Sequence, residues 1–271
     1  MRLTLLACLA FLGATPLAAQ TLSGETFDCV MDPVDVIALG APVTGILEDV
    51  LVRRGERVTK GQPIARLESS VEEATVKLLR TRADSDEAIL AQTARRDLIA
   101  VQRERIATLV DRNVASAEQL QEAEAELVAA NALLAQAELE REIANQELAR
   151  ALQQLDQRTI KSPIDGIILS RDLSGGEYVA ANGSIVSIVQ LDPLLIEAFL
   201  PVELYPAISN GQRAMIAPAA PFTDNYEAQV ITFDQVFDAA SGTFGVELEL
   251  PNPGSLLPAG HRCILSFPGD G

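Results

Sequence analysis

The sequence predicts an elongated α+β protein: a long antiparallel α-helical coiled-coil hairpin is inserted in a split β-sandwich, and a small β-barrel follows. Three observations predict this fold. A stretch of 99 residues, 64–162, contains no Gly, no Pro and no aromatic side chain, although the chain has 17 Gly and 14 Pro. The segments on either side of that stretch repeat each other. Most of the aromatic residues come after the second repeat.

The chain begins with the features of a secretory signal peptide. Met1-Arg2 precedes an apolar run from Leu3 to about Ala14, and a small residue stands before the expected cut after Ala19. The run is too short for a membrane span, which needs about 20 apolar residues. We therefore expect residues 1–19 to be removed and the mature chain to be exported and soluble.

Composition narrows the function further. The chain has 21 Lys plus Arg against 38 Asp plus Glu, a formal charge of −17, which argues against nucleic acid as a partner. No group of His, Cys and carboxylates has metal-ligand spacing, so we expect no metal site. Cys29 and Cys263 remain in the mature chain. A disulfide between them and two buried free thiols are equally open alternatives.

Extended segments come before the glycine-free stretch. Residues 20–40 predict extended structure, with the barrel as one place where this segment can pair. Residues 41–68 contain short β-branched runs separated by Gly45, Gly55 and Gly61, which is typical of strands joined by tight turns.

The glycine-free stretch has the pattern of a coiled coil. In its second part leucine recurs every seven residues, interrupted only at Arg141, and alanine fills the other seam position. The leucines are Leu120, Leu127, Leu134, Leu148 and Leu155, and the alanines are Ala123, Ala130, Ala137, Ala144 and Ala151. The first part is less regular, because polar residues share its seven-residue frame. These are Thr81, Ser85, Gln92, Arg95 and Gln102.

One break divides this stretch. Residues 111–115 lack the period, and Ser116 with Gln119 forms a capping-box pattern. We expect one helix at about 69–110 and a second at about 117–156, joined by a short turn into a hairpin over 69–156. A globular helical bundle is the alternative, but the flanking sequence favours strands and supplies no third long helix.

The segment after the hairpin, 157–191, repeats the one before it. Pro42 and Pro163, Gly45 and Gly166, Gly55 and Gly176, and Val58 and Val179 are all separated by 121 positions. One residue is then expected to be added, so that Gly61 matches Gly183. Because a hairpin returns the chain to its starting point, the two halves are predicted to close into one sandwich.

Residues 192–267 predict the barrel, and 268–271 are a tail. A strand is expected at 194–200 and a short helix at 201–208, beginning at proline. Further strands are expected at 213–217, 226–233, 244–250 and 262–267. Eight of the ten aromatic residues from Phe27 onward lie here and would fill a barrel core.

The repeated halves resemble the split biotinyl/lipoyl domain of periplasmic adaptor proteins, also called membrane fusion proteins. The first half carries G-x-x-x-x-V-x-V-x-x-G-x-x-V-x-K-G-x-x-I-A-x-L and the second I-K-S-P-x-D-G-x-I. The resemblance covers about 40–191 and implies a lipoyl-like sandwich. Lys60 and Lys161 do not stand where carrier domains attach their group, so we expect no biotin, no lipoate and no other cofactor. The family's membrane-proximal domain is expected to be absent or vestigial.

The turn between the helices carries a second resemblance. Arg105, Leu109 and Ser116 stand at R-x-x-x-L-x-x-x-x-x-x-S spacing. This is similar to the tip motif by which adaptors of tripartite efflux pumps meet a TolC-type outer-membrane channel. Each residue also has a structural explanation: Ser116 as a helix cap, Leu109 in the seam, and Arg105 paired with Glu104 or Asp111.

The resemblance implies a non-enzymatic periplasmic adaptor. It would form a homo-oligomeric ring, trimeric or hexameric, on an inner-membrane transporter, most often of the resistance-nodulation-division (RND) class. Its hairpins would reach a TolC-type outer-membrane channel. The alternatives are an adaptor of an ABC-type or other export system, a coiled-coil scaffold without a pump, and an enzyme. No nucleophile motif or phosphate loop supports an enzyme.

Overall fold

The computed structural model describes residues 25–268. The expected signal peptide, 1–19, and all but one residue of the expected tail lie outside them. The chain divides into two compact units: one is Ile37–Ile188, and the other combines the residues up to Val36 with those from Val189 onward.

The first of these units contains the short strands of the two repeats. Before the helices come β2 (Gly45–Val50), β3 (Arg57–Val58) and β4 (Pro63–Leu67). After them come β5 (Thr159–Lys161), β6 (Gly166–Arg171), β7 (Tyr178–Val179) and the beginning of β8 (Ser184–Pro201). A four-stranded sheet has the order β5-β4-β2-β7, and β3 pairs with β6.

The two repeats exchange strands across a pseudo-twofold axis. β2 pairs with β7 so that Gly45 lies opposite Val179, and β3 pairs with β6 so that Val58 lies opposite Gly166. The two pairs are equivalent, because Val58 and Gly45 of the first half correspond, 121 positions later, to Val179 and Gly166 of the second. Each half therefore supplies the strand that the other half needs.

Backbone hydrogen bonds repeat in the same way and correct one detail. Gly55 N donates to Ile168 O at 2.8 Å, and Gly176 N donates to Leu47 O at 2.7 Å. The sequence predicts one added residue in the second half after Val179. In the structure, Gln62 N donates to Thr59 O and Gly183 N donates to Ala180 O, and these two bonds are still 121 positions apart. The expected match of Gly61 with Gly183 is wrong. The turn geometry aligns Gln62 with Gly183 because the two turns have equal length.

Both halves contribute equivalent side chains to one core. Leu47 and Ile168 are each 1% exposed, and Ile64 and Ile185 are 0% exposed. Val58 and Val179 are buried in the same cluster. Such shared burial of apolar surface, and not either half alone, stabilises the sandwich.

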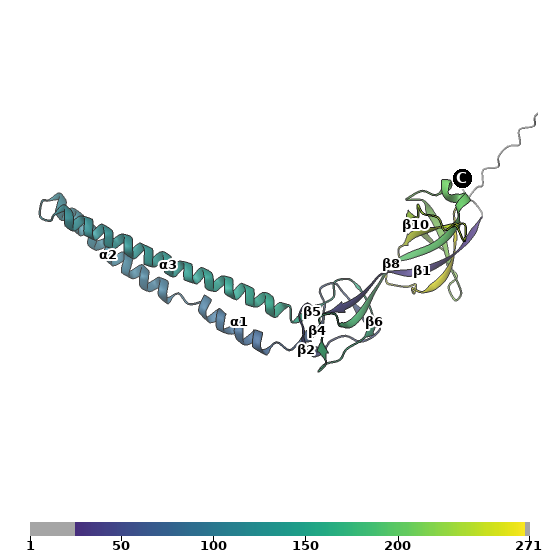
Figure 1. The fold of residues 1–271 in the computed structure, drawn as a ribbon, viewed down its shortest axis with the longest axis horizontal. Helices are drawn as coiled ribbons and strands as arrows, with labels where there is room; N and C mark the ends of the chain where they lie inside the picture. The colour runs from purple at the N-terminus through teal and green to yellow at the C-terminus, as the bar shows by residue number, and fades with distance from the viewer. Residues whose placement is uncertain (1–24, 269–271) are drawn as a thin grey trace, which may run out of the picture. The chain divides into compact units, whose positions relative to one another are not determined.

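Three helices connect the halves: α1 (Ser70–Ala83), α2 (Glu87–Asp111) and α3 (Ala117–Asp156). α3 packs against both α1 and α2 and lies alongside them in Figure 1. The expectation of one continuous helix at 69–110 is wrong, because residues 84–86 separate α1 from α2.

Local side chains explain this break. The sequence there is Asp84-Ser85-Asp86, and short polar side chains compete for backbone hydrogen bonds within a helix. The hydroxyl of Ser85 donates to the carboxylate of Glu87. Ser85 is one of the polar residues in the seven-residue frame, so its side chain adds no apolar contact to the seam at this position.

α3 buries its alanine row against the other two helices. Ala123, Ala130, Ala137, Ala144 and Ala151 are its buried residues. Small side chains on this row let the helix axes come close. Arg141, the exception in the leucine row, is exposed.

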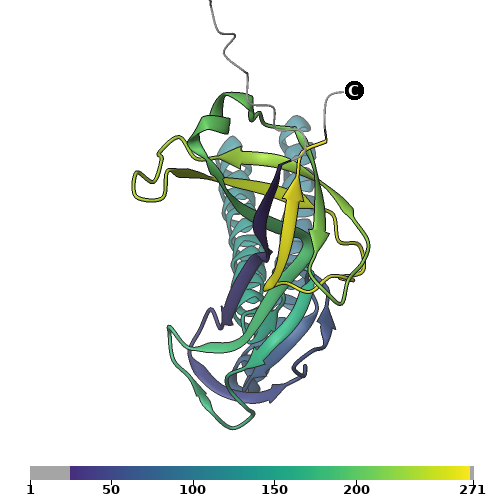
Figure 2. The same cartoon turned by 90° about the vertical axis from the view of Figure 1, so that its right-hand side faces the viewer.

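The second unit is a closed barrel. Its strands are β1 (Thr26–Gly40), β8, β9 (Arg213–Pro218), β10 (Tyr226–Phe233), β11 (Thr243–Leu250) and β12 (His261–Ser266). Their order is β1-β12-β9-β10-β11-β8, and a β1–β8 pairing closes the ring. Figure 2 shows β1 in dark purple beside β12 in yellow. The short helix expected at 201–208 is present as a 3₁₀ helix at Val202–Ala207, which contains Pro206.

The barrel core is apolar and partly aromatic. Phe244 is 1% exposed, and Tyr205 packs edge-on against its ring at a centroid distance of 5.2 Å. Asn252 is the buried polar residue here. Its side-chain amide donates to Leu191 O and Leu257 O, and its oxygen accepts from Leu257 N. These bonds satisfy the amide and hold the segment before β12.

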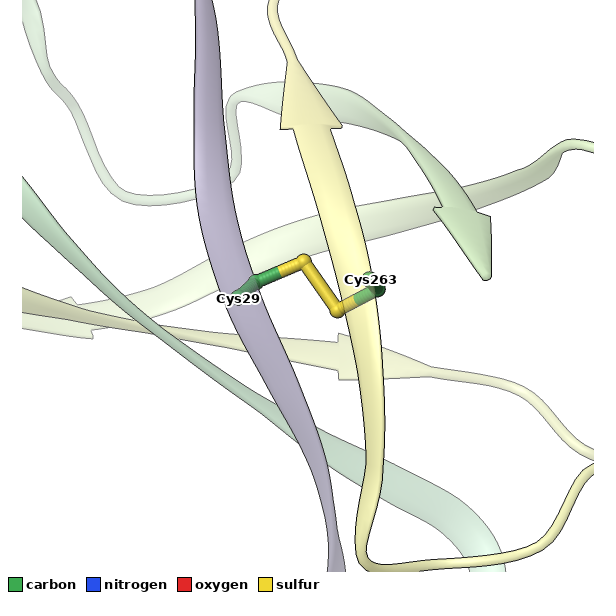
Figure 3. Close-up of a disulfide and its surroundings, with 2 residues drawn as sticks. All are labelled: Cys29 and Cys263. Carbon is green, nitrogen blue, oxygen red and sulfur yellow. A yellow bond between two sulfur atoms is a disulfide. The ribbon is translucent and has the colours of Figure 1, made fainter. Parts of the chain in front are cut away.

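Cys29 and Cys263 form a disulfide inside the barrel (Figure 3). They are register partners on β1 and β12, and they are 4% and 2% exposed. Of the two alternatives left open by the sequence, the structure contains the bond. It links strands that are 234 positions apart in the chain.

We predict that Cys29→Ser/Cys263→Ser lowers the free energy of unfolding of the barrel by about 2–5 kcal/mol, because the bond closes a very long loop. Denaturant unfolding under non-reducing conditions measures it. An unchanged unfolding midpoint, or two reactive thiols in the denatured, unreduced wild-type protein, would contradict the prediction.

We predict that Ala130→Asp destabilises the helices by more than about 2 kcal/mol, because a charge without a partner is buried in the seam. Ala130 is 2% exposed. Ala132 is exposed on the same helix, so Ala132→Asp is the matched control and should cost less than about 1 kcal/mol. The loss of helical circular dichroism on heating measures both. Equal midpoints would be the contrary result.

Candidate functional site: the tip of the helices

The turn between α2 and α3 is held by backbone hydrogen bonds. Leu109 O accepts from Val114 N at 2.8 Å and from Ala115 N at 3.3 Å. Asn113 N donates to Val110 O at 2.8 Å, and Asn113 itself has a φ of 60°. Asn is one of the few residues with a side chain that adopts this left-handed conformation readily. The tip is therefore a defined turn with few internal degrees of freedom.

Ser116 caps α3. Its hydroxyl oxygen accepts from Gln119 N at 3.2 Å, and the Gln119 side chain accepts from Ser116 N at 2.9 Å. The capping box predicted from the sequence is confirmed. The cap uses one lone pair of the Ser116 oxygen, so Ser116 acts first on the geometry of the tip, and its hydroxyl hydrogen and second lone pair remain for a partner.

Arg105 is exposed on α2, and its guanidinium has no ion pair or hydrogen bond within residues 25–268. The pairing with Glu104 or Asp111 considered from the sequence is not formed. Glu104 is contacted instead by Arg103 at 3.3 Å, and Arg103 also binds Glu124 at 2.6 Å. The bond to Glu124 raises the pKa of the Arg103 guanidinium. Two neighbouring arginines thus differ: one ties α2 to α3, and the other is available.

Leu109 is half-buried, and the most exposed apolar side chain at the tip is Val114, at 72%. Sequence reasoning did not single out Val114. The signal was present, because it is the one large apolar residue in the polar turn Asp111-Arg112-Asn113-Val114.

This arrangement is suited to binding a protein surface. A guanidinium can donate several hydrogen bonds to carbonyl or carboxylate oxygens, and an apolar side chain beside it adds contact area. Because the turn is already ordered, little conformational entropy is lost on binding.

The lysines considered for a prosthetic group lie elsewhere. Lys60 follows β3 in an exposed turn, where its backbone nitrogen donates to Asp165 at 2.8 Å. Lys161 ends β5 and pairs with Asp156 at 2.6 Å. Within the described part of the chain, no group of three or more His, Cys, Asp or Glu is placed to hold a metal ion.

Among the helices described, none combines the length and hydropathy needed to cross a bilayer.

Known proteins resemble this chain over most of its length. The family model of the CzcB-like, barrel-sandwich hybrid domain matches residues 35–190. Macrolide export protein MacA of Yersinia pestis is 25% identical over 235 residues, which are 84% of this chain and 63% of that protein. Nodulation protein NolF of Rhizobium meliloti is 22% identical over 234 residues, 86% of this chain and 60% of that protein. The chain spans less than two thirds of the length of these relatives.

Solved structures share the fold. MacA from Actinobacillus actinomycetemcomitans has a TM-score of 0.73 at 21% identity, with 89% of this chain and 78% of that chain covered. Membrane fusion protein Spr0693 from Streptococcus pneumoniae has a TM-score of 0.61 at 16% identity, with 92% of this chain and 100% of that chain covered.

We predict that Ser116→Ala destabilises α3 by about 1 kcal/mol, because the N-cap is lost, whereas Ser116→Asp retains the cap and the stability. Thermal unfolding followed by circular dichroism compares the two. If both substitutions left the midpoint unchanged, Ser116 would have no capping role in solution.

Proposed function

Because the chain belongs to the periplasmic adaptor, or membrane fusion protein, family with a CzcB-like barrel-sandwich hybrid domain, we propose that it connects an inner-membrane efflux transporter to a TolC-type outer-membrane channel. The family is in general non-enzymatic, and the proposed role requires no catalysis. The transporter we propose is of the RND class. The observation that carries the proposal is the ordered tip with an unpaired Arg105, an exposed Val114 and the Ser116 cap.

We propose that α1, α2 and α3 act together as one coiled-coil hairpin that spans distance. α3 has 40 residues. At 1.5 Å per residue it is roughly 60 Å long. The buried alanine row along α3 supports this proposal, since it gives one continuous seam with both other helices. A rod of this kind would carry the tip away from the rest of the molecule.

Working boundaries follow from this proposal. Residues 41–68 and 157–191 form the two lipoyl-like halves, 69–156 the hairpin, and 192–267 the barrel, to which residues 25–36 of the N-terminal segment contribute. The pairing of β1 with β12 supports assigning the N-terminal segment to the barrel.

We propose that the protein works in the periplasm as a homo-oligomeric ring, trimeric or hexameric. The Cys29–Cys263 disulfide supports an oxidising compartment. A single tip offers few contacts, and a ring raises the effective concentration of the remaining tips once one has bound.

Site-specific photo-crosslinking in the cells that encode the protein tests the partners. A photoreactive residue at Val114 should capture a TolC-type outer-membrane channel, and the same residue at Leu78, 70% exposed on α1, should not. At Val236, 83% exposed in the barrel, it should capture an RND transporter. Capture of an ABC-type transporter would favour the other kind of export system. Capture of no membrane protein at all would favour a scaffold.

We predict that Arg105→Asp abolishes export while changing the free energy of unfolding by less than about 0.5 kcal/mol, because the side chain is exposed and has no partner among residues 25–268. Arg80→Asp, an exposed arginine on α1, is the matched control and should export normally. Drug susceptibility of a deletion strain that carries each variant measures export. Normal export by Arg105→Asp would remove the docking role of Arg105.

A further inference from the structure

The middle of the helical hairpin differs from both of its ends. Residues 84–86 interrupt only one of the two helical sides, because α3 runs without a break past this point. α1 packs on one part of α3 and α2 on another. The hairpin thus consists of two halves that share a single continuous helix.

Arg141, the one exception in the leucine row of α3, is the residue of α3 that contacts the break. Arg141 binds the carboxylate of Asp86 at 2.7 Å, and both side chains are largely exposed, at 44% and 53%. Arg82, just before the break, binds Glu147 at 3.2 Å in the same exposed manner. Exposed ion pairs stabilise little, so the polar contacts between the two sides are weak here.

A surface groove also lies beside the seam at this point. It has a volume of about 840 Å³ and is lined by Ser85, Ala88, Ala137, Arg141 and Ala144, among others. Further along α2, the side-chain oxygen of Gln92 is buried and has no hydrogen-bond partner in the part of the chain described. A groove and an unsatisfied oxygen both favour movement of the facing surfaces over tight packing.

The break itself is close to helical. Asp84 has φ −79° and ψ −8°, and Asp86 has φ −104° and ψ −5°, both in the right-handed helical region. Asp86 makes no side-chain capping bond to α2, in contrast to the full capping box that starts α3. Ser85, between these two helical residues, therefore carries the interruption, and no side-chain cap locks the start of α2.

From these observations we propose that Asp84–Asp86 is a built-in joint of the hairpin. α2 changes its angle to α1 about this segment while α3 bends smoothly. The exposed Arg141–Asp86 ion pair stabilises one of the angles between α1 and α2. The tip can thereby change position while the base of the hairpin keeps its packing. This inference concerns the hairpin alone and does not rest on the proposed partners.

Distances from pulsed electron–electron double resonance test the joint in the full chain. This chain carries Cys8→Ser and keeps the Cys29–Cys263 disulfide. One pair of labels, at Lys77 on α1 and Gln102 on α2, spans the break. A reference pair, at Gln102 and Glu122 on α3, lies within one half. We expect the first distance distribution to be at least roughly twice as wide as the second, or to have two maxima. A distribution as narrow as the reference would overturn the proposal.

A set of substitutions tests the cause. Asp84→Ala, Ser85→Leu, Asp86→Ala and Arg141→Leu together remove the competing polar groups, fill the seam and should make the helix continuous. We expect the distribution across the break to narrow to that of the reference pair. Arg150→Leu, the same replacement at an exposed position elsewhere on α3, is the control and should leave it wide. No narrowing in the quadruple variant would contradict the joint. If that variant does not fold, the wild-type comparison decides.

Discussion

The antiparallel pairing of β4 with β5 is the constraint on which the rest of the unit depends. Arg66 lies opposite Thr159, and Leu67 N donates to Arg158 O at 2.8 Å, so the chain leaves for the helices and returns at one place. Arg158 also forms an ion pair with Glu72 at the start of α1, which ties the beginning of α1 to the sandwich. With departure and return adjacent, the two repeats can exchange β3 and β7 and bury one shared core. Without that closure each half would expose its apolar side chains.

Much of this could be predicted because the informative patterns are local or repeat. The alanine row of α3, the Ser116 cap and the 121-residue offset of the repeats all follow from spacing along the chain. The break at Asp84–Asp86 could not, because seam residues such as Thr81 and Ser85 were also compatible with one imperfect helix. Whether Cys29 bonds Cys263 depended on β1 and β12 becoming neighbours, which is a long-range pairing that no local pattern encodes.

In the candidate site, too, local spacing could be predicted from the sequence and packing could not. The positions of Arg105, Leu109 and Ser116 near the turn follow from the sequence, but their individual states do not. That Arg103 and not Arg105 is neutralised depends on which face of α2 meets Glu124. Val114 is more exposed than Leu109 because of the shape of the turn. This shape comes from the left-handed Asn113 and from the two hydrogen bonds that Leu109 O accepts from backbone N–H groups. The packing of α2 on α3 decides the first and the geometry of the turn the second, and together they give the tip an available guanidinium beside an exposed apolar side chain.

One measurement tests most directly whether the helices are an inserted arm with a separate task. In the variant, residues 70–156 are replaced by a short Asn-Gly turn between β4 and β5. The account predicts that the sandwich and barrel still unfold cooperatively with the disulfide intact, and that export is lost. If the strands no longer folded, the repeats would depend on the helices for more than closure. If export continued, the tip would not be the site that meets a partner.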